Sequence, residues 1–395
     1  MTAEGVLIIG GGLASQRAIE TLRARGYAGR IRMVCGEPEL PYDRPPLSKG
    51  LLSGATEEAE IGFRPARWYA DERVKLVFGH HATRLDEKRR RVRLDDGREL
   101  AYDTLLIATG STPRRLPVLE RYSNVHFLRT LADARRLRNE LRRGARLAIV
   151  GAGFIGQEVA ATARAAGAEV TQIEALPAPL GGVLGSEIGQ WLMRMHADEG
   201  VDVRLSTKLE AARGNGTVEE LRLSRGETLD CDTVVVGIGV VPSAGWLAGS
   251  GLGTDGVITD HRGRTCVADV FAAGDLTRGF DPRVGEYRRS EHWDAAARQG
   301  AAAARAMLGE TPEPGPAPSF WSDQYGLRIQ YTGYAELSDE ATVEGNPDER
   351  CFSVVYTRQG RPVGALTVND PRTYARLRRE VERTFERQNG EKERR

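Results

Sequence analysis

Two segments far apart in the chain repeat one pattern, in which an apolar run leads through a glycine-rich turn into a helix-like spacing of apolar residues. They are GVLIIGGGLASQRAIETLRARG, residues 5–26, and ARLAIVGAGFIGQEVAATARAAGAEVTQIE, residues 145–174. A buried strand, a tight glycine turn and an amphipathic helix together open a βαβ unit with a parallel sheet. Two such units predict an α/β protein with two doubly wound, Rossmann-like dinucleotide-binding domains.

The first glycine turn has the spacing Gly10-x-Gly12-x-x-Ser15, and Glu37 follows 22 residues after Ser15, at the end of the next expected strand. Glycines allow the backbone to approach a pyrophosphate, and the helix N-terminus offers unpaired N–H groups to it. Glu37 could accept a hydrogen bond from a ribose hydroxyl. Because Ser15 stands where the pattern has Gly or Ala, an ordinary glycine turn is the alternative.

The second glycine turn, Gly151-x-Gly153-x-x-Gly156, matches the pattern fully, and Glu174 lies 18 residues beyond Gly156. A carboxylate in this place pairs with a free ribose 2′-hydroxyl and repels a 2′-phosphate. No arginine stands next to Glu174 to hold such a phosphate. The motif therefore favours NADH over NADPH.

Two more apolar strands, in residues 102–111 (YDTLLIATGS) and 231–242 (CDTVVVGIGVVP), are expected to close the two sheets. The Pro-rich connector TPEPGPAPS, residues 311–319, precedes a segment of alternating strand patterns. We expect one dinucleotide-binding domain from residues 1–112 and 243–312, a second from residues 113–242, and a C-terminal α+β domain from residues 313–395. The last twenty or so residues are mostly charged and are expected to fray.

Composition narrows the possible ligands. The 56 Lys and Arg residues balance 55 Asp and Glu residues, so no net field attracts nucleic acid or an anionic membrane. The four cysteines, Cys35, Cys231, Cys266 and Cys351, lack metal-ligand spacing, and no apolar run approaches 18 residues. We therefore expect a cytoplasmic protein with no metal site, no nucleic-acid partner and no membrane anchor.

Eight short motifs occur in the order GGGLAS, PYDRPPLSK, ATG, GAGFIGQE, VGIGVVP, FAAGD, EHW and FWSDQY. Together they resemble the FAD-dependent NADH:ferredoxin reductases of oxygenase systems, including putidaredoxin and rubredoxin reductases, with apoptosis-inducing factor as a more distant relative. The resemblance covers nearly the whole chain and is most specific in PYDRPPLSK and FWSDQY. It implies the glutathione-reductase-like plan, an FAD domain interrupted by an NAD domain and followed by a C-terminal α/β domain.

The resemblance also implies roles for single residues. Lys49 would pair with Glu158 beside the flavin ring, and Trp321 would lie near the flavin and the nicotinamide. Independently of the resemblance, Ser290 in SEHWDAAARQG has the chemistry of an N-cap, which predicts a helix that begins close to Glu291, His292 and Trp293. The N-terminus of this helix would be directed at the flavin. The FAD or NAD contacts implied by the resemblance are Gly10, Gly12, Ala14, Ser15, Glu37, Arg44, Lys49, Ala82, Ala108, Thr109, Gly110, Arg129, Gly151, Gly153, Phe154, Ile155, Gly156, Glu158, Glu174, Gly239, Gly274, Asp275, Glu291, His292, Trp293 and Trp321.

The expected function is transfer of electrons from NADH through FAD to a small iron–sulfur carrier, a ferredoxin or a rubredoxin, that serves an oxygenase or P450. The protein would be a monomer or a homodimer. One departure from the family is the loop ALPAPLGGVLG after Glu174, which lacks the usual basic residue and predicts looser contacts to the NADH phosphates.

Three other functions compete with this one. A flavin disulfide reductase or peroxidase needs a reactive cysteine, but the loop after Tyr42 has Ser48 and no cysteine, and Cys35 is expected to be buried. A membrane quinone reductase needs an amphipathic anchor, for which the C-terminus offers only Leu377, Val381 and Phe385. The third is an NADH-responsive redox-signalling protein that resembles apoptosis-inducing factor.

Overall fold

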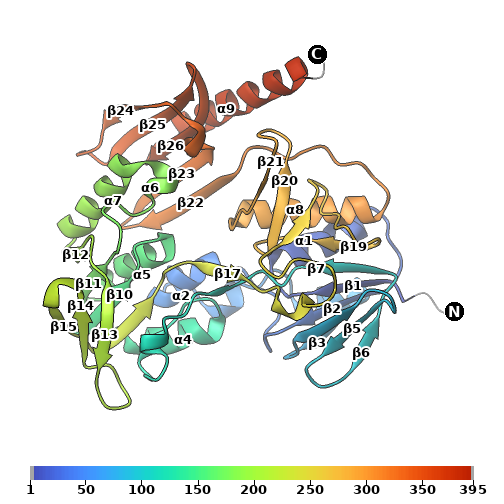
Figure 1. Ribbon diagram of the computed structural model, residues 1–395, viewed down its shortest axis with the longest axis horizontal. Coiled ribbons are helices and arrows are strands. Elements are labelled where there is room, and N and C mark those ends of the chain that lie inside the picture. The colour runs from blue at the N-terminus through green and yellow to red at the C-terminus, as the bar shows by residue number, and fades with distance from the viewer. Residues whose placement is uncertain (1–3, 393–395) are drawn as a thin grey trace. The chain divides into compact units, whose positions relative to one another are not determined.

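The computed structural model describes residues 4–392, with side chains of the last helix described as far as Glu386. The chain forms two compact units whose segments alternate along the sequence, and Figure 1 labels their elements. Unit 1 consists of Met1–Asp43, Ala59–Thr112 and Val241–Pro318, and unit 2 consists of Arg44–Glu58, Pro113–Val240 and Ser319–Arg395. Residues 44–58 lie inside the range expected for the first domain, yet they group with unit 2.

The centre of unit 1 is a five-stranded parallel sheet with the order β19-β7-β1-β2-β3. Its strands are β19 (Val270–Ala272), β7 (Thr104–Ile107), β1 (Val6–Ile9), β2 (Ile31–Cys35) and β3 (Val74–Phe78). Residues on both faces of β1 and β2 are buried, as a parallel sheet covered on both sides requires. The apolar run at residues 102–111 pairs with β1 as predicted, but it does not close the sheet, because β19 pairs with its other edge.

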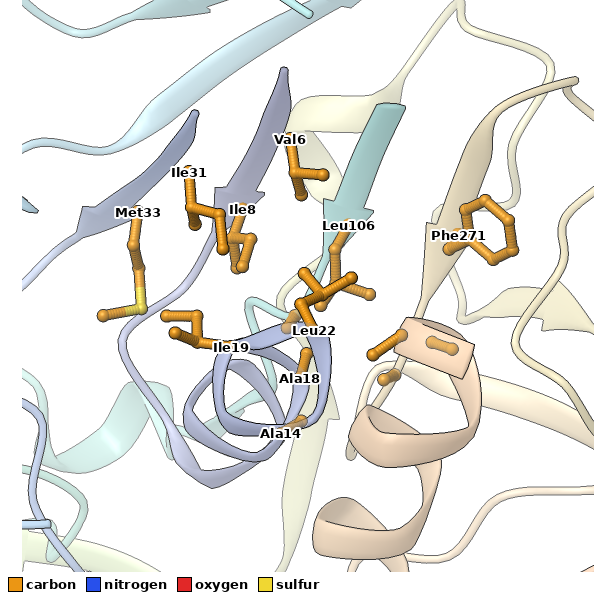
Figure 2. Packing of buried hydrophobic residues seen from close by; sticks show 14 of the residues in the cluster. Val6, Ile8, Ala14, Ala18, Ile19, Leu22, Ile31, Met33, Leu106 and Phe271 are labelled. Atoms are coloured by element: carbon orange, nitrogen blue, oxygen red, sulfur yellow. The ribbon is translucent and has the colours of Figure 1, made fainter. Parts of the chain in front are cut away.

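One face of this sheet is covered by the helices α1 (Leu13–Ala24) and α8 (Trp293–Met307). Figure 2 shows Ala18, Ile19 and Leu22 of α1 directed at Ile8 and Leu106 of the sheet. The two helices approach closely where Gly300 of α8 meets α1. A Cβ atom at this glycine would lie 2.1 Å from the carbonyl oxygen of Ala14.

The other face packs against the antiparallel sheet β4-β5-β6 and the segment near Ala244 and Leu247. The remaining elements of unit 1 are β4 (Ala82–Asp86), β5 (Arg91–Leu94), β6 (Glu99–Ala101), β18 (Val257–Thr259), β20 (Thr277–Asp281), β21 (Glu286–Arg288), α3 (Ala66–Asp71) and η5 (Gly245–Leu247). The chain leaves unit 1 within β8 (Ser111–Pro113) and returns within β17 (Val240–Pro242).

Unit 2 contains a second five-stranded parallel sheet, with the order β12-β11-β10-β16-β9. Its elements are β9 (Val125–His126), β10 (Arg146–Val150), β11 (Glu169–Ile173), β12 (Asp202–Arg204), β16 (Thr233–Val236), α4 (Leu131–Glu140), α5 (Phe154–Ala165), α6 (Gly181–Leu184) and α7 (Ser186–Asp198). One face packs on the small antiparallel sheet of β13 (Leu209–Arg213), β14 (Glu220–Leu223) and β15 (Thr228–Asp230). The loop that joins this unit early in the chain forms η1 (Pro45–Ser48) and α2 (Gly50–Ser53).

The C-terminal part of unit 2 is a five-stranded antiparallel sheet, β22-β23-β26-β25-β24, with one long helix. Its elements are β22 (Ser319–Gln324), β23 (Leu327–Gly333), β24 (Glu340–Asn346), β25 (Cys351–Arg358), β26 (Arg361–Val368) and α9 (Pro371–Lys392). The expected fraying of the last twenty residues is wrong as far as Lys392. Leu377, Val381 and Phe385 follow one helix face and are 1%, 0% and 3% exposed, so burial of this stripe stabilises α9. Within residues 4–392, no helix is long and apolar enough to cross a membrane.

Candidate functional site

The first glycine turn joins β1 to α1, and its glycines serve different purposes. Gly10 has φ +121°, and a Cβ atom there would lie 2.1 Å from the carbonyl oxygen of Ala108, so no other residue fits. Gly12 is the N-cap of α1, and a Cβ atom there would meet nothing within 4 Å. The Ser15 hydroxyl in the first turn of the helix is buried and has no hydrogen-bond partner among the described residues. This helix terminus therefore offers open space and unused donors.

Three turns gather at the carboxyl edge of this sheet, after the adjacent strands β1, β7 and β19. The turn after β7 contains Ala108, Thr109 and Gly110, and the Thr109 hydroxyl donates to the carbonyl oxygen of Ser243. In the turn after β19, a Cβ atom at Gly274 would lie 3.5 Å from the Cβ of Ala14. Parallel sheets bind ligands at this edge.

Asp275 is held in this group by the Ser111 hydroxyl, which donates to Asp275 Oδ2 at 2.8 Å. The amide N–H of Gly274 donates to Gln299 Oε1 of α8 at 2.7 Å, so the helix braces the same turn. Ser111 and Gln299 were missed by sequence reasoning. Neither stands in a motif with a known spacing, and each acts through a partner more than 20 residues away.

Helix α8 begins at Trp293, in the predicted region, but its cap differs from the expectation. The N-cap of α8 is His292 and its side chain makes no cap bond, so the prediction that Ser290 caps the helix is wrong. The Ser290 hydroxyl is buried without a partner among the described residues. Trp293 Nε1 donates to Asp43 Oδ1 at 2.7 Å, and Glu291 pairs with Arg289 at 2.9 Å. Burial lowers the pKa of His292, with the Asp275 carboxylate acting in the opposite direction.

Glu37 follows β2 and accepts a hydrogen bond from the Tyr42 hydroxyl. Ala82 begins β4, one residue after His81, whose ring lies against Gly36. The end of β2, Glu37 and the loop before β4 are therefore neighbours within unit 1.

The second glycine turn joins β10 to α5 in unit 2. Gly151 has φ +103°, and a Cβ atom there would lie 2.4 Å from the carbonyl oxygen of Gly237. Gly153 is the N-cap of α5, and a Cβ atom at Gly156 would lie 2.4 Å from the carbonyl oxygen of Gly151. Gly237 was missed by the sequence reasoning, which chose Gly239 of the same segment. Gly239 has φ +95° and accepts from the Arg114 amide at 2.9 Å.

Glu174 braces this turn through both oxygens of its carboxylate. Oε2 accepts from the amide of Ala152 at 2.8 Å, and Oε1 accepts from the amide of Leu176 at 2.9 Å. Each carboxylate oxygen keeps a second lone pair for a ligand hydroxyl. In the same turn, Phe154 packs on Phe320 with ring centroids 4.6 Å apart, while Ile155 is 42% exposed.

The expected ion pair is present within unit 2, where Lys49 Nζ lies 2.6 Å from Glu158 Oε2. Lys49 follows η1, whose prolines fix the loop, and Glu158 lies in the second turn of α5. Two serines that were not assigned to the site complete the shell of Glu158. Ser48 donates to Oε2 at 2.5 Å and Ser322 of β22 donates to Oε1 at 2.7 Å. The buried carboxylate therefore accepts from three donors, which offsets its desolvation.

Arg44, Arg129 and Trp321 lie on other parts of unit 2. Arg44 donates to the carbonyl oxygen of Arg129, in the residue before the cap of α4. Trp321 is half-buried on β22, one residue from Ser322, so the two side chains point to opposite faces of the strand. The Arg328 guanidinium lies 5.6 Å from the centre of the Trp321 ring.

The chain matches known proteins over most of its length. Residues 4–300 match the family described as pyridine nucleotide-disulphide oxidoreductase, and residues 319–391 match the reductase C-terminal family. The anthranilate 1,2-dioxygenase system ferredoxin–NAD(+) reductase component of Burkholderia cepacia is 39% identical over 96% of this chain and 94% of its own. Rhodocoxin reductase of Rhodococcus erythropolis is 35% identical over 95% and 88%.

A solved structure gives the same result for the fold. The reductase in the covalent putidaredoxin reductase–putidaredoxin complex superimposes with a TM-score of 0.93 at 32% identity. The superposition covers 96% of this chain and 93% of that one.

Proposed function

The chain belongs to the pyridine nucleotide-disulphide oxidoreductase family, and on that premise we propose that it is an FAD-dependent NADH:ferredoxin reductase. Such an enzyme takes two electrons from NADH and delivers them one at a time to a small iron–sulfur protein. The observation that carries the proposal is the presence of two glycine turns, each opening a helix at the edge of its own parallel sheet. One chain thus offers two dinucleotide sites.

Unit 1 fits FAD. The open space before Gly12 and the unused donors of the first turn of α1 suit a pyrophosphate, and no acidic residue stands in that turn to repel it. Glu37 offers a carboxylate for a ribose, and Asp275 offers one for the ribityl hydroxyls. Further residues are proposed to contact the bound FAD: Ala82, Ala108, Thr109, Gly110, Gly274, and Glu291, His292 and Trp293 at the start of α8. Arg44 and Arg129 are further proposed contacts.

Residues 113–240 of unit 2 fit NAD(H). Gly151, Gly153 and Gly156 form the turn, and Glu174 presents a carboxylate that is already fixed by two backbone amides. This rigid anion favours NADH, because a 2′-phosphate would meet a like charge. Phe154, Ile155 and Gly239 are proposed to border the bound nucleotide.

Bound FAD supplies the conversion between two-electron nicotinamide chemistry and one-electron chemistry. The chain contributes binding and charge. We assign Lys49, Glu158 and Trp321 to the electron-transfer step. The Lys49 ammonium provides a positive charge, and Glu158 keeps it paired and oriented at 2.6 Å.

The cysteines argue against disulfide chemistry. Cys35 follows the first helix in the chain, but burial raises its pKa to about 12, and the nearby Glu37 carboxylate acts in the same direction. Burial raises the pKa of Cys231 to about 12 as well. A thiol with such a pKa is protonated at neutral pH and is a poor nucleophile.

The partner follows from the relatives' names, which describe ferredoxin reductases of dioxygenase systems and a complex with putidaredoxin. We propose that this chain reduces a ferredoxin that serves an oxygenase or P450. The cytoplasmic location expected from the sequence remains a prediction.

The test begins with the purified protein. Denaturation should release non-covalent FAD, and NADH should bleach the flavin absorbance near stoichiometric amounts. NADH-dependent reduction of cytochrome c should rise when a ferredoxin from a panel is added. Absence of flavin, or a reduction rate that no ferredoxin changes, would contradict the assignment.

A further inference from the structure

A chain of five polar side chains runs through the interior of unit 2 and ends on Glu158. The Tyr325 hydroxyl lies 2.8 Å from His196 Nδ1, and His196 Nε2 lies 2.9 Å from Gln324 Oε1. Gln324 Nε2 lies 3.0 Å from the Ser322 hydroxyl, which lies 2.7 Å from Glu158 Oε1. The proposed function uses only the last member, so the other four require an explanation.

Because these five side chains are buried, the position of each hydrogen among them affects the stability of the protein. His196 and Ser322 are fully buried, Gln324 is 2% exposed and Glu158 is 5% exposed. A donor or acceptor left unpaired in such a place is destabilising, because it has lost its hydrogen bonds to water and gained none in return. The hydrogens must therefore be arranged so that every polar atom finds a partner.

Glu158 determines which group donates and which accepts at one end of this series of hydrogen bonds, because an ionised carboxylate only accepts hydrogen bonds. Its Oε2 is used by Lys49 and Ser48. Its Oε1 is within reach of the Ser322 hydroxyl, whose hydrogen must therefore point to Glu158. The Ser322 oxygen is then free to accept from Gln324.

Gln157 determines the orientation of the Gln324 amide, in the middle of this series of hydrogen bonds. Its own amide N–H donates to the carbonyl oxygen of Ala152 at 2.7 Å, which turns its Oε1 toward Gln324. Gln324 Nε2 lies 3.3 Å from this oxygen, so the amide nitrogen of Gln324 faces Gln157 and Ser322. The carbonyl oxygen of Gln324 consequently faces His196.

These two constraints determine the state of His196. Its Nε2 must carry the hydrogen that Gln324 Oε1 accepts, and its Nδ1 must accept from the Tyr325 hydroxyl. The reverse order would leave Glu158 Oε1 without the Ser322 hydrogen. It would also place the amide oxygens of Gln157 and Gln324 against each other.

We propose that Gln324 and His196 are positioning residues for Glu158. They form a one-way hydrogen-bond array that holds the Ser322 hydrogen on the Glu158 carboxylate, and this array fixes His196 as its Nε2–H tautomer. The role of Glu158 in flavin reduction rests on the proposed function, but the hydrogen-bond array itself does not. Burial lowers the pKa of His196 to about 4 and raises the pKa of Tyr325, so both groups are neutral at pH 7.

Nitrogen NMR of the full-length, FAD-loaded protein tests the tautomer. The sequence has six histidines, so selective 15N-histidine labelling gives a tractable spectrum, and His196→Gln identifies the signal of His196. We expect a neutral ring with the hydrogen on Nε2 at pH 7. A hydrogen on Nδ1, or a charged ring, would overturn the array.

Flavin reduction tests the positioning role. Gln324→Leu should slow the reduction of FAD by NADH about fivefold, the worth of one hydrogen bond. Combined with Glu158→Gln it should cause no further loss, because it acts through Glu158. An equal loss in both backgrounds would mark Gln324 as a purely structural residue and would contradict the proposal.

Two further variants make this test robust. Should Gln324→Leu fail to fold, Ser322→Ala should show the same dependence on Glu158, and Ser322→Thr should restore the rate. Thr367→Val is the matched control, because Thr367 is fully buried in the same sheet and its hydroxyl has no partner among the described residues. It should leave the rate unchanged. Absence of any reduction by NADH would refute the proposed function, whereas the NMR result would stand by itself.

Discussion

At the scale of single residues, two glycines in one turn are constrained for different reasons. Gly12→Ala should fold normally, because the added methyl meets nothing within 4 Å, yet it should lose FAD, because the methyl fills the space before the helix N-terminus. Gly10→Ala should destabilise the fold by about 1–3 kcal/mol or more, since φ is +121° and the methyl strikes Ala108. The ratio of flavin to protein absorbance, measured beside urea unfolding, separates the two effects. Similar behaviour of both variants would refute the distinction.

Glu174 holds the second glycine turn in place, and it is also proposed to recognise the ribose of the bound nucleotide. Replacing Glu174 by Ala and Ala175 by Arg should move the preference from NADH toward NADPH by about 1–3 kcal/mol, because one charge-assisted contact replaces another. Since Glu174 also holds the amides of Ala152 and Leu176, the single change Glu174→Ala should weaken both nucleotides. Steady-state kcat/KM for NADH and NADPH measures this. Equal efficiency of the wild type with the two nucleotides would contradict it.

Lys49 and Glu158 should behave as one group. Lys49→Met leaves the carboxylate with its two serine donors. Glu158→Gln removes the carboxylate charge from the ammonium, which also donates to the Pro45 carbonyl oxygen at 3.4 Å. Both should slow flavin reduction, and Lys49→Met should also change the flavin spectrum. The double variant should lose less than the sum, with a coupling of about 0.5–3 kcal/mol. Stopped-flow rates equal to the wild type would reduce the pair to an ion pair with a structural role only.

At the scale of elements, the contact between α1 and α8 is set by one residue. Gly300→Ala would place a methyl 2.1 Å from the Ala14 carbonyl oxygen, so the helices must separate, at a cost of about 1–3 kcal/mol. Because Ala14 and Gln299 belong to the proposed FAD site, flavin content should fall too. Gly182→Ala in α6 is the control, since its methyl meets nothing within 4 Å. A Gly300 variant as stable as this control would refute the close contact.

The secondary-structure elements also show which parts of the fold and of the candidate site could be predicted from the sequence alone. The glycine turns and the two sheets were predictable, since motif spacing and apolar periodicity report them directly. The pair of Lys49 with Glu158 was expected only from the family resemblance, because taken alone the two residues look like an ordinary loop lysine and a helix-face carboxylate. The start of α8 was predicted correctly, but Ser290 was wrongly chosen as its cap. The N-cap is His292, and the Ser290 hydroxyl is buried without a partner among the described residues. The contacts of Ser322 and Gln324 join residues more than 100 positions apart. The signal that could have revealed these contacts was the presence of two polar residues, Ser322 and Gln324, on the buried face of β22.

At the scale of the whole molecule, stability should depend on pH through His196. Its pKa is lowered from 6.5 to about 4 by burial, so the unfolded chain binds a proton before the folded one does. The neutral ring contributes its full stability above pH 6.5, and this contribution is lost as the pH falls from 6.5 to about 4. At 1.36 kcal/mol per pH unit, the loss is about 3 kcal/mol.

Urea unfolding at several pH values checks this expectation. His196→Gln keeps a donor for Gln324 but cannot titrate, so its stability should decline less steeply than that of the wild type between pH 6.5 and 4. Parallel curves for the two proteins would show that His196 does not contribute to acid sensitivity.

Because the segments of the two units alternate along the chain, unit 1 can complete its parallel sheet only late in synthesis. β1 and the first glycine turn leave the ribosome early, but β19, Asp275 and α8 follow more than 250 residues later. At 5–20 residues per second, this interval is on the order of 10–50 s. From the time β7 is made until β19 follows, β7 has no partner strand on its outer edge, and an unpaired strand edge is prone to aggregation. Flavin capture by unit 1 must consequently wait until its last segment, which ends at Pro318, has been made.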